Sequence, residues 1–198
     1  GVEALMRWRA EDGSLVPPDR FIPVAERSGL IVGLGTWVLR TALSDLGRLH
    51  QLGWRPLRMA VNVSAVQFGQ PDFLQTLDEA LSDKQIAPDC LELEITESVS
   101  MVGMERVAAV MREIRSRQVA VAIDDFGTGF SSLSYLDQLP ADRLKIDRAF
   151  VELLETERPG ARIARMIVPL GHQLGMKVLA EGVETERQLA ILRDLGCD

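Results

Sequence analysis

The sequence predicts an α/β protein built as a (β/α)₈ barrel, and three observations support this. Short runs rich in Val, Ile and Leu recur along the chain, and each is followed by a helical pattern. The apolarity of these runs is nearly continuous, which is typical of parallel strands that helices cover on both faces. Polar residues stand at the end of one predicted strand after another, about one strand–helix unit apart.

The first strand is expected at Glu3–Trp8 and is already in progress when the chain begins. Five buried strands follow at Met59–Val63, Leu91–Thr96, Val119–Asp124, Arg143–Ile146 and Lys177–Ala180. Because a complete barrel has eight strands, two are unaccounted for. We therefore expect one domain over residues 1–198 that is incomplete at both ends.

Helix signals fill the segments between the strands. Thr36 is expected to cap a helix that runs to about Leu52, and Pro71 to take the first position of another. Thr185 and Gln188 form a capping-box pattern for the last helix. Apolar residues at helical spacing predict two buried faces, one formed by Val107, Val110, Met111 and Ile114 and one by Ile163, Met166, Ile167, Leu170 and Leu174.

Composition excludes several classes of function. Lys and Arg number 22 against 29 Asp and Glu, and a net charge of −7 argues against binding a DNA or RNA polymer. Two cysteines exclude a disulfide scaffold, and two histidines leave little for a His-based zinc site. With no apolar run near the roughly 20 residues of a membrane span, we expect a cytoplasmic protein. Any metal must then be held by oxygen ligands.

The polar strand ends decide between two α/β architectures. An open doubly wound sheet gathers its site at one switch point, from two or three strands. A barrel points all of its strand ends at one mouth. Five predicted strands carry a polar residue at or near this end, namely Asn62, Glu94, Asp124, Lys145 and Glu181. The barrel is therefore favoured.

This mouth would be crowded with carboxylates, from Glu3, Glu94, Asp124, Asp125 and Glu181, beside the amide of Asn62. Taken singly, each carboxylate has the alternative interpretation of a helix cap or loop anchor. Taken together, they would repel one another and take up protons unless cations compensated them. Carboxylate and amide oxygens suit Mg²⁺ or Mn²⁺. One carboxylate of the Asp124–Asp125 pair could bridge two such ions, which with a Lys and an Arg describes a site for a phosphate ester.

Sequence blocks along the whole chain support a family resemblance. They are Glu3-Ala4-Leu5 with Arg7-Trp8, Phe21-Ile22-Pro23, Asn62-Val63-Ser64, Glu92-Leu93-Glu94-Ile95-Thr96-Glu97, Asp124-Asp125-Phe126-Gly127, Leu144-Lys145-Ile146-Asp147 and Ala180-Glu181-Gly182-Val183-Glu184. In this order they resemble the EAL-domain family of bacterial cyclic-di-GMP phosphodiesterases. The resemblance implies a modified TIM barrel, of which this chain would lack the first and last strands.

The resemblance also implies a role for each residue. Glu3, Asn62 and Glu94 match metal ligands, Asp124 the carboxylate shared by two ions, Asp125 a ligand of the second ion, and Glu181 a glutamate near that ion, sometimes assigned as general base. Lys145 matches the lysine that contacts the nucleophilic water and the phosphate, and Arg7 the arginine that holds a substrate phosphate. Glu97 matches a glutamate that anchors the loop after Asp125, and Asp147 and Glu184 match residues near the substrate.

The expected function is metal-dependent hydrolysis of cyclic-di-GMP to linear 5′-pGpG in bacterial signalling, with two Mg²⁺ or Mn²⁺ ions. An inactive cyclic-di-GMP receptor remains an alternative, as does a metal-free glycosidase with two carboxylates. The resemblance implies a homodimer, with sensory or GGDEF-type domains in a parent chain that could be membrane-tethered.

His50 and His172 are interpreted as structural or surface residues, and Trp8, Trp37 and Trp54 as packing residues.

Overall fold

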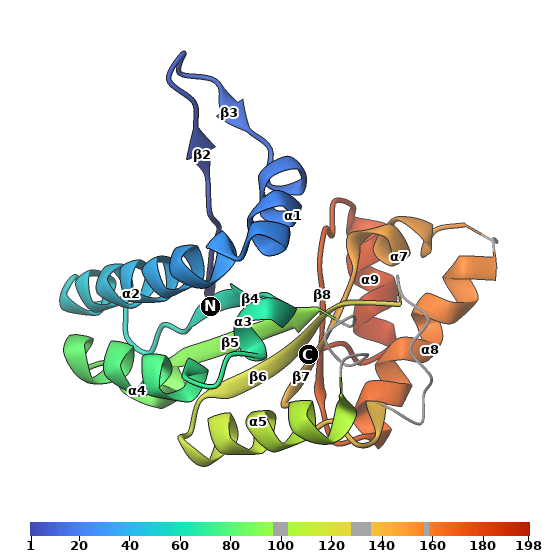
Figure 1. Cartoon of the computed structure of the whole chain (residues 1–198). Coiled ribbons are helices and arrows are strands. Elements are labelled where there is room, and N and C mark those ends of the chain that lie inside the picture. Colours follow the sequence, from blue (N-terminus) through green and yellow to red (C-terminus); the bar gives the residue numbers. More distant parts are fainter. Residues whose placement is uncertain (97–102, 128–135, 157–158) are drawn as a thin grey trace. The chain divides into compact units, whose positions relative to one another are not determined.

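The computed structural model describes residues 1–96, 103–127, 136–156 and 159–198 (Figure 1). In chain order its elements are β1 Val2–Ala4, β2 Trp8–Arg9, β3 Leu15–Val16, α1 Pro18–Ser28, α2 Leu30–Gln51, β4 Met59–Val63, α3 Ala65–Phe68, α4 Phe73–Lys84, the 3₁₀ turn η1 Pro88–Cys90, β5 Leu91–Thr96, α5 Met104–Ser116, β6 Ala120–Phe126, β7 Arg143–Ile146, α7 Arg148–Leu153, α8 Pro159–Gln173, β8 Lys177–Ala180 and α9 Glu186–Asp194. The described residues form two compact units, which are residues 1–94 with 113–119, and residues 95–112 with 120–198.

The first unit contains the neighbouring strands β1, β4 and the start of β5. β1 pairs with β4 in parallel, with Glu3 opposite Ala60. Helices α2 and α4 lie side by side in this unit (Figure 1). The core contains fully buried leucines from both helices, among them Leu43, Leu46 and Leu77. The antiparallel β2–β3 hairpin also belongs to this unit.

The second unit contains β6, β7 and β8, which are neighbours in chain order and run parallel. Their buried side chains, such as Ile123, Leu144 and Val178, form its core. Helix α8 contacts both β7 and β8. In each unit the parallel strands follow chain order without reversal, as in a barrel and unlike the reversed order of a doubly wound sheet.

The α/β prediction is confirmed, and four predicted strands match the structure residue for residue: β4, β5, β7 and β8. The predicted strand at Val119–Asp124 is displaced, since β6 begins at Ala120 and continues to Phe126. Whether the chain folds as a single domain stays a prediction.

The prediction of a strand over Glu3–Trp8 is wrong in extent. β1 ends at Ala4, and Trp8 belongs to the separate strand β2, which pairs with Val16 of β3. The turn of this hairpin contains Gly13 at φ 84, where Ser14 donates two hydrogen bonds to Asp12. β1 pairs with the distant strand β4, whereas β2 pairs with its hairpin partner β3. Apolar residues occur in both kinds of strand, so the sequence pattern alone did not show that Glu3–Trp8 contains two strands.

Two predicted helix starts are also wrong. Gly29 takes a left-handed conformation at φ 76 and lets α2 begin at Leu30, so Thr36 lies inside the helix and its hydroxyl donates to the Val32 carbonyl at 3.1 Å. Helix α4 begins at Phe73, two residues after Pro71. By contrast, the predicted capping box of Thr185 and Gln188 is confirmed at the start of α9.

Of the two predicted apolar helix faces, one is correct. In α5 Val107, Met111 and Ile114 are buried. In α8 the buried face is formed instead by Ala161, Ala164, Ile167 and Val168, while Ile163 and Met166 are exposed. Small alanines give no strong hydrophobic signal, so the sequence pattern placed the face by its large side chains.

No single helix among the described residues is long and apolar enough to cross a membrane. Helices α1 and α2 together reach the required length and apolarity, but the chain bends by 119° between them.

Asp142, the residue before β7, forms two hydrogen bonds with β6, and replacing it should destabilise the second unit. Asp142 accepts a hydrogen bond from the Val121 amide at 3.0 Å, and its own amide donates to the Val121 carbonyl at 2.8 Å. Asp142→Ala leaves the buried Val121 amide without this acceptor and should lower the free energy of unfolding by about 1–3 kcal/mol. Urea denaturation measures this. Asp137→Ala, at an exposed position, is the control and should change little; equal effects would contradict the prediction.

Candidate functional site

Glu3 and Asn62 lie together in the first unit. Glu3 stands on β1 and Asn62 on the adjacent strand β4, and the Asn62 Nδ2 donates a hydrogen bond to the Glu3 Oε1 at 2.6 Å. The parallel pairing of the two strands brings these side chains together across 59 residues of sequence. With its amide nitrogen turned toward Glu3, the Asn62 carbonyl oxygen is the atom that would face a cation.

Glu94 belongs to β5, the next strand after β4, and is only 2% exposed. A carboxylate is rarely buried to this degree without compensating charge or hydrogen bonds. Its neighbours Leu93 and Ile95 are buried as well, so this carboxylate stands in a fully buried stretch of the strand. That Glu94 is a metal ligand stays a prediction, and its burial shows that it is not a solvated surface charge.

A β-bulge arranges Asp124 and Asp125 in the second unit. Along β6 and β7, Ile123 pairs with Leu144 and Phe126 with Ile146, so the two aspartates together stand opposite Lys145. Adjacent residues of a regular strand point to opposite faces, which would separate the two carboxylates. The bulge, with Asp125 at φ 53, interrupts this alternation, and the Asp125 amide donates to the Asp124 Oδ1 at 3.0 Å.

Lys145 is a buried cation between two carboxylates. Its Nζ lies 3.2 Å from the Asp124 Oδ1 and 2.6 Å from the Glu181 Oε1, and the residue is 3% exposed. Each of these residues comes from a different strand or strand end: β6, β7 and the residue after β8. The Glu181 amide donates to the Ile146 carbonyl at 3.1 Å, which continues the β7–β8 ladder by one residue and fixes this glutamate beside Lys145.

The pKa of the Asp125 carboxyl is raised above its ordinary value. Burial is the largest cause, followed by the negative charges of Asp124, Asp147 and Glu181, while Lys145 acts in the opposite direction. This agrees with the expectation that the carboxylates repel one another when no cation compensates them. It also shows that Asp147 lies close enough to Asp125 to act on it.

Asp147 and Glu184 each have a local structural role as well. Asp147 caps α7, where its side chain accepts from the Ala149 amide at 2.9 Å. Glu184 forms an ion pair with Arg148 at 2.9 Å, and its side chain is 59% exposed. Sequence reasoning missed Arg148; its position directly after Asp147 was the available signal.

Gly182, which follows Glu181, allows Arg148 to approach the backbone. Its φ is +67, and a Cβ there would stand 2.8 Å from the Arg148 Cβ. Gly196 has a similar φ of +82, but its nearest neighbour would be 4.0 Å away. Both Ala variants strain the backbone, and Gly182→Ala should cost about 1–3 kcal/mol more in unfolding free energy than Gly196→Ala. Chemical denaturation of both proteins compares them; equal costs would disprove the steric argument.

Arg7 lies in a groove of the first unit with a volume of about 540 Å³. The lining includes two further arginines and two tryptophans, namely Arg9, Arg20, Trp8 and Trp37. Trp8 contacts Phe21 edge-on at 5.7 Å between ring centroids, yet it is 52% exposed, and Trp37 is 58% exposed. The interpretation as packing residues therefore holds in part for Trp8, which packs against Phe21, but Trp37 and Trp54 are exposed.

The two histidines have structural partners, as expected. The His50 Nε2 lies 2.9 Å from the Leu57 carbonyl oxygen, and the His172 Nε2 lies 3.0 Å from the Asp198 Oδ2. The Val178 amide also donates to Asp198 at 2.8 Å, and this bond, followed by His172, lowers the pKa of the Asp198 carboxyl. Neither histidine is a candidate catalytic residue.

The residues predicted to hold metal are all oxygen donors, which suits hard divalent cations. Over the described ranges, however, no three or more His, Cys, Asp or Glu side chains gather closely enough to hold an ion. Glu3 with Asn62, and Asp124 with Asp125 and Glu181, are each assembled within their own unit. Glu97, the predicted loop anchor, lies outside the described residues.

Comparison with known proteins identifies relatives along the whole chain. The family model for the EAL domain matches residues 1–198. The cyclic di-GMP phosphodiesterase NbdA of Pseudomonas aeruginosa is 43% identical over 197 residues, which cover 100% of this chain and 25% of the relative. The bifunctional diguanylate cyclase/cyclic di-GMP phosphodiesterase MucR of the same organism is 42% identical, covering 100% of this chain and 29% of MucR. The chain thus spans about a quarter of each relative.

Among solved structures, the MucR phosphodiesterase in complex with c-di-GMP superimposes with a TM-score of 0.93 at 41% identity. The match covers 99% of this chain and 79% of that one. This likeness confirms the prediction of a barrel of the TIM type and excludes the open doubly wound sheet.

Proposed function

The chain belongs to the EAL domain family, and on this basis we propose that it hydrolyses cyclic-di-GMP to linear 5′-pGpG. One observation carries the proposal most strongly: the buried ammonium of Lys145 between Asp124 and Glu181, opposite the bulge that presents two adjacent aspartates. A degenerate relative would be expected to have lost part of such a charged cluster, because burying it is costly without a function.

In the proposed reaction the oxygen of a water attacks one phosphorus of the cyclic dinucleotide, and the bond from that phosphorus to the 3′ oxygen breaks. Lys145 would orient the water through its ammonium and offset charge that develops on the phosphoryl oxygens. Glu181, 2.6 Å from the Lys145 Nζ, would take one proton of the water while the other stays on the oxygen that joins the phosphorus, and the 3′ oxygen would leave with a proton supplied by solvent. Arg7, in the groove of the first unit, would hold a phosphate with its guanidinium fork.

Glu3, Asn62, Glu94, Asp124, Asp125 and Glu181 would hold two Mg²⁺ or Mn²⁺ ions, which their oxygen donors suit. When bound, these ions would supply charge neutralisation and a more acidic water. Asp124 would be the shared ligand. Asp147 and Glu184 would lie near the substrate, where their bonds to Ala149 and Arg148 would fix their orientation.

The second candidate is a receptor that binds cyclic-di-GMP without cutting it. Arg148 favours it in one respect: its ion pair with Glu184 gives that glutamate a structural role that needs no catalysis. Hydrolysis is nevertheless favoured, because every residue that the family resemblance assigns to metal or water is retained.

For the whole protein we propose a cytoplasmic location of this domain, a homodimer, and further sensory or GGDEF-type domains in the same chain. The name of MucR, a bifunctional diguanylate cyclase and cyclic di-GMP phosphodiesterase, supports the proposal of a cyclase domain in the same chain. The parent protein could be tethered to the membrane by a part outside this sequence.

Incubation of the protein with cyclic-di-GMP and Mn²⁺ or Mg²⁺, followed by chromatography of the nucleotides, tests the proposal. We expect linear 5′-pGpG from the wild type and none from Asp124→Asn. Intact cyclic-di-GMP together with saturable binding would favour the receptor. Intact cyclic-di-GMP without binding would refute both.

A further inference from the structure

We propose that Gln67 is a positioning residue for Asn62, and that Gly35 exists as glycine to admit it. The inference rests on the proposed function, in which Asn62 is a ligand of the catalytic centre. Gly35 of α2 and Gln67 of α3 are in contact in the interior of the first unit. Neither residue is proposed to bind the metal or the phosphate, so their effect on the reaction would be indirect.

Gln67 fixes the turn that directly follows Asn62. β4 ends at Val63, and Ser64 caps the short helix α3. The Gln67 Oε1 accepts from the Ser64 amide at 3.3 Å and from its hydroxyl at 3.2 Å, while the Ser64 Oγ accepts from the Gln67 amide at 3.2 Å. This capping box holds the backbone two residues after Asn62.

The Gln67 side chain is held in turn by helix α2. It is only 8% exposed and lies against Gly35, which is buried in α2. A Cβ atom at Gly35 would overlap the Gln67 carboxamide at its nitrogen, carbon and oxygen. Any residue but glycine would therefore push the carboxamide out of its place. Since the far end of glutamine is flexible, the side chain would swing away and the helix would remain.

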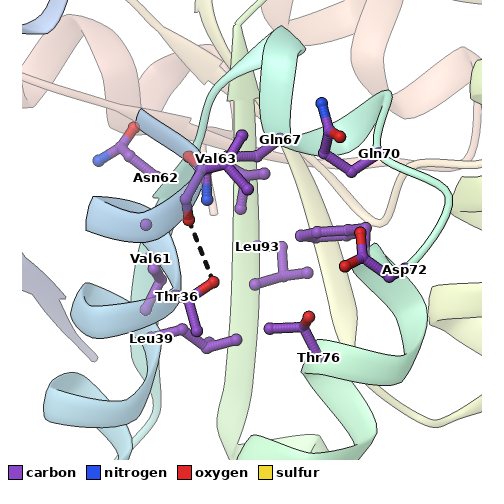
Figure 2. A pocket seen from close by; sticks show the side chains of 13 residues that line it. Thr36, Leu39, Val61, Asn62, Val63, Gln67, Gln70, Asp72, Thr76 and Leu93 are labelled. Atoms are coloured by element: carbon purple, nitrogen blue, oxygen red, sulfur yellow. Dashed lines mark hydrogen bonds between the residues drawn. The ribbon is translucent and has the colours of Figure 1, made fainter. Parts of the chain in front are cut away.

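Asn62, Gly35 and Gln67 line one small pocket of about 50 Å³ in the first unit. Figure 2 shows Asn62, Val63 and Gln67 at the same end of this pocket, with Leu39 and Thr76 at the other. Val63, between Asn62 and Ser64, is 5% exposed and is the last residue of β4. The Asn62 side chain donates to Glu3 at 2.6 Å and stands two residues before Ser64, so a shift of Ser64 would reach it through the backbone of Val63.

Helix α2 offers a matched control in Gly33. It lies in the same helix two residues away, and a Cβ there would meet nothing within 4 Å. Gly33→Ala and Gly35→Ala add the same methyl group and the same gain in helix propensity. Gly33 is exposed and Gly35 is buried, and only the methyl group at Gly35 would displace Gln67.

The variants Gly33→Ala, Gly35→Ala, Gln67→Met and Gln67→Glu separate positioning from packing. Methionine keeps the length of Gln67 but has no oxygen acceptor, whereas glutamate retains the capping box. In the metal-free protein, the NMR signals of the Asn62 side-chain amide should move in Gly35→Ala and Gln67→Met. They should stay near their wild-type positions in Gly33→Ala and Gln67→Glu.

In the loaded enzyme, Gly35→Ala and Gln67→Met should lower kcat for cyclic-di-GMP by about tenfold to a hundredfold, with KM changed less than about twofold. In an Asn62→Ala background Gln67→Met should cost no further activity, because the residue through which it acts is gone. Unmoved Asn62 signals in Gly35→Ala and Gln67→Met, or an equal loss in both backgrounds, would overturn the proposal. If the wild type forms no linear product, the proposed function fails, while the NMR comparison still tests the positioning.

Discussion

Replacing Lys145 with methionine is expected to reduce hydrolysis of cyclic-di-GMP by at least about a hundredfold. The reason is that the ammonium is the cation that contacts both Asp124, at 3.2 Å, and Glu181, at 2.6 Å. Without it, a proposed water would lose its orienting donor. Asp124, which is 7% exposed, would also lose a compensating charge, which costs about 3–5 kcal/mol when one partner of a buried pair is removed.

Steady-state turnover and urea denaturation measure the two effects of Lys145→Met separately. Lys177→Met removes an exposed lysine from the first residue of β8 and should change neither. Lys145→Arg keeps the positive charge and should recover stability more than activity, because a planar guanidinium cannot take the position of a compact ammonium. Turnover in Lys145→Met above half of the wild-type value would remove this residue from the mechanism.

Removal of divalent metal is expected to have an effect of similar size. After dialysis against EDTA, turnover should fall by at least about a hundredfold, which corresponds to the several kcal/mol that bound cations contribute to such transition states. The raised pKa of Asp125 supports this expectation, because burial and neighbouring carboxylates create a site that favours positive charge.

Addition of Mg²⁺ or Mn²⁺ to the dialysed protein should restore turnover in the wild type but not in Asp124→Asn. Titration with Mn²⁺, followed by electron paramagnetic resonance, should report two ions per chain in the presence of substrate. A hydrolase that works with two carboxylates alone, such as a glycosidase, would keep its activity in EDTA. Full turnover in the chelator would therefore exclude the two-ion proposal.

The strands that carry the candidate site could be predicted because their sequences are locally decisive. Runs such as Leu91–Thr96 and Arg143–Ile146 alternate Leu or Ile with polar residues over a strand-like length and follow a Pro and an Asp, and both were correct in extent. Helix starts were harder. α2 begins after Gly29 rather than at Thr36 because a left-handed glycine can end one helix and start another, which a search for capping side chains does not detect.

The exposed tryptophans and the groove around Arg7 could not be predicted for a different reason. The burial of a side chain depends on which distant residues pack against it. The residues next to Trp8 and Trp37 in the sequence do not indicate this, so their exposure could not be predicted. Likewise, Gln67 resembles any polar residue of a short helix. Only its contact with Gly35, 32 residues earlier in the sequence, distinguishes it.

The sequence by itself determined which functional side chains this protein has: carboxylate and amide oxygens, one lysine and one arginine, at or near strand ends and in the order of the EAL family. Only the tertiary structure decided which of these side chains lie together. Whether Asp124 and Asp125 serve one site depends on a bulge, and the bulge depends on the register between β6 and β7. Register is a property of two strands packed together, so the residues of one strand do not specify it. The same pairing sets Lys145 beside Asp124, and the β7–β8 pairing adds Glu181, so the buried lysine owes each of its two carboxylate partners to a neighbouring strand.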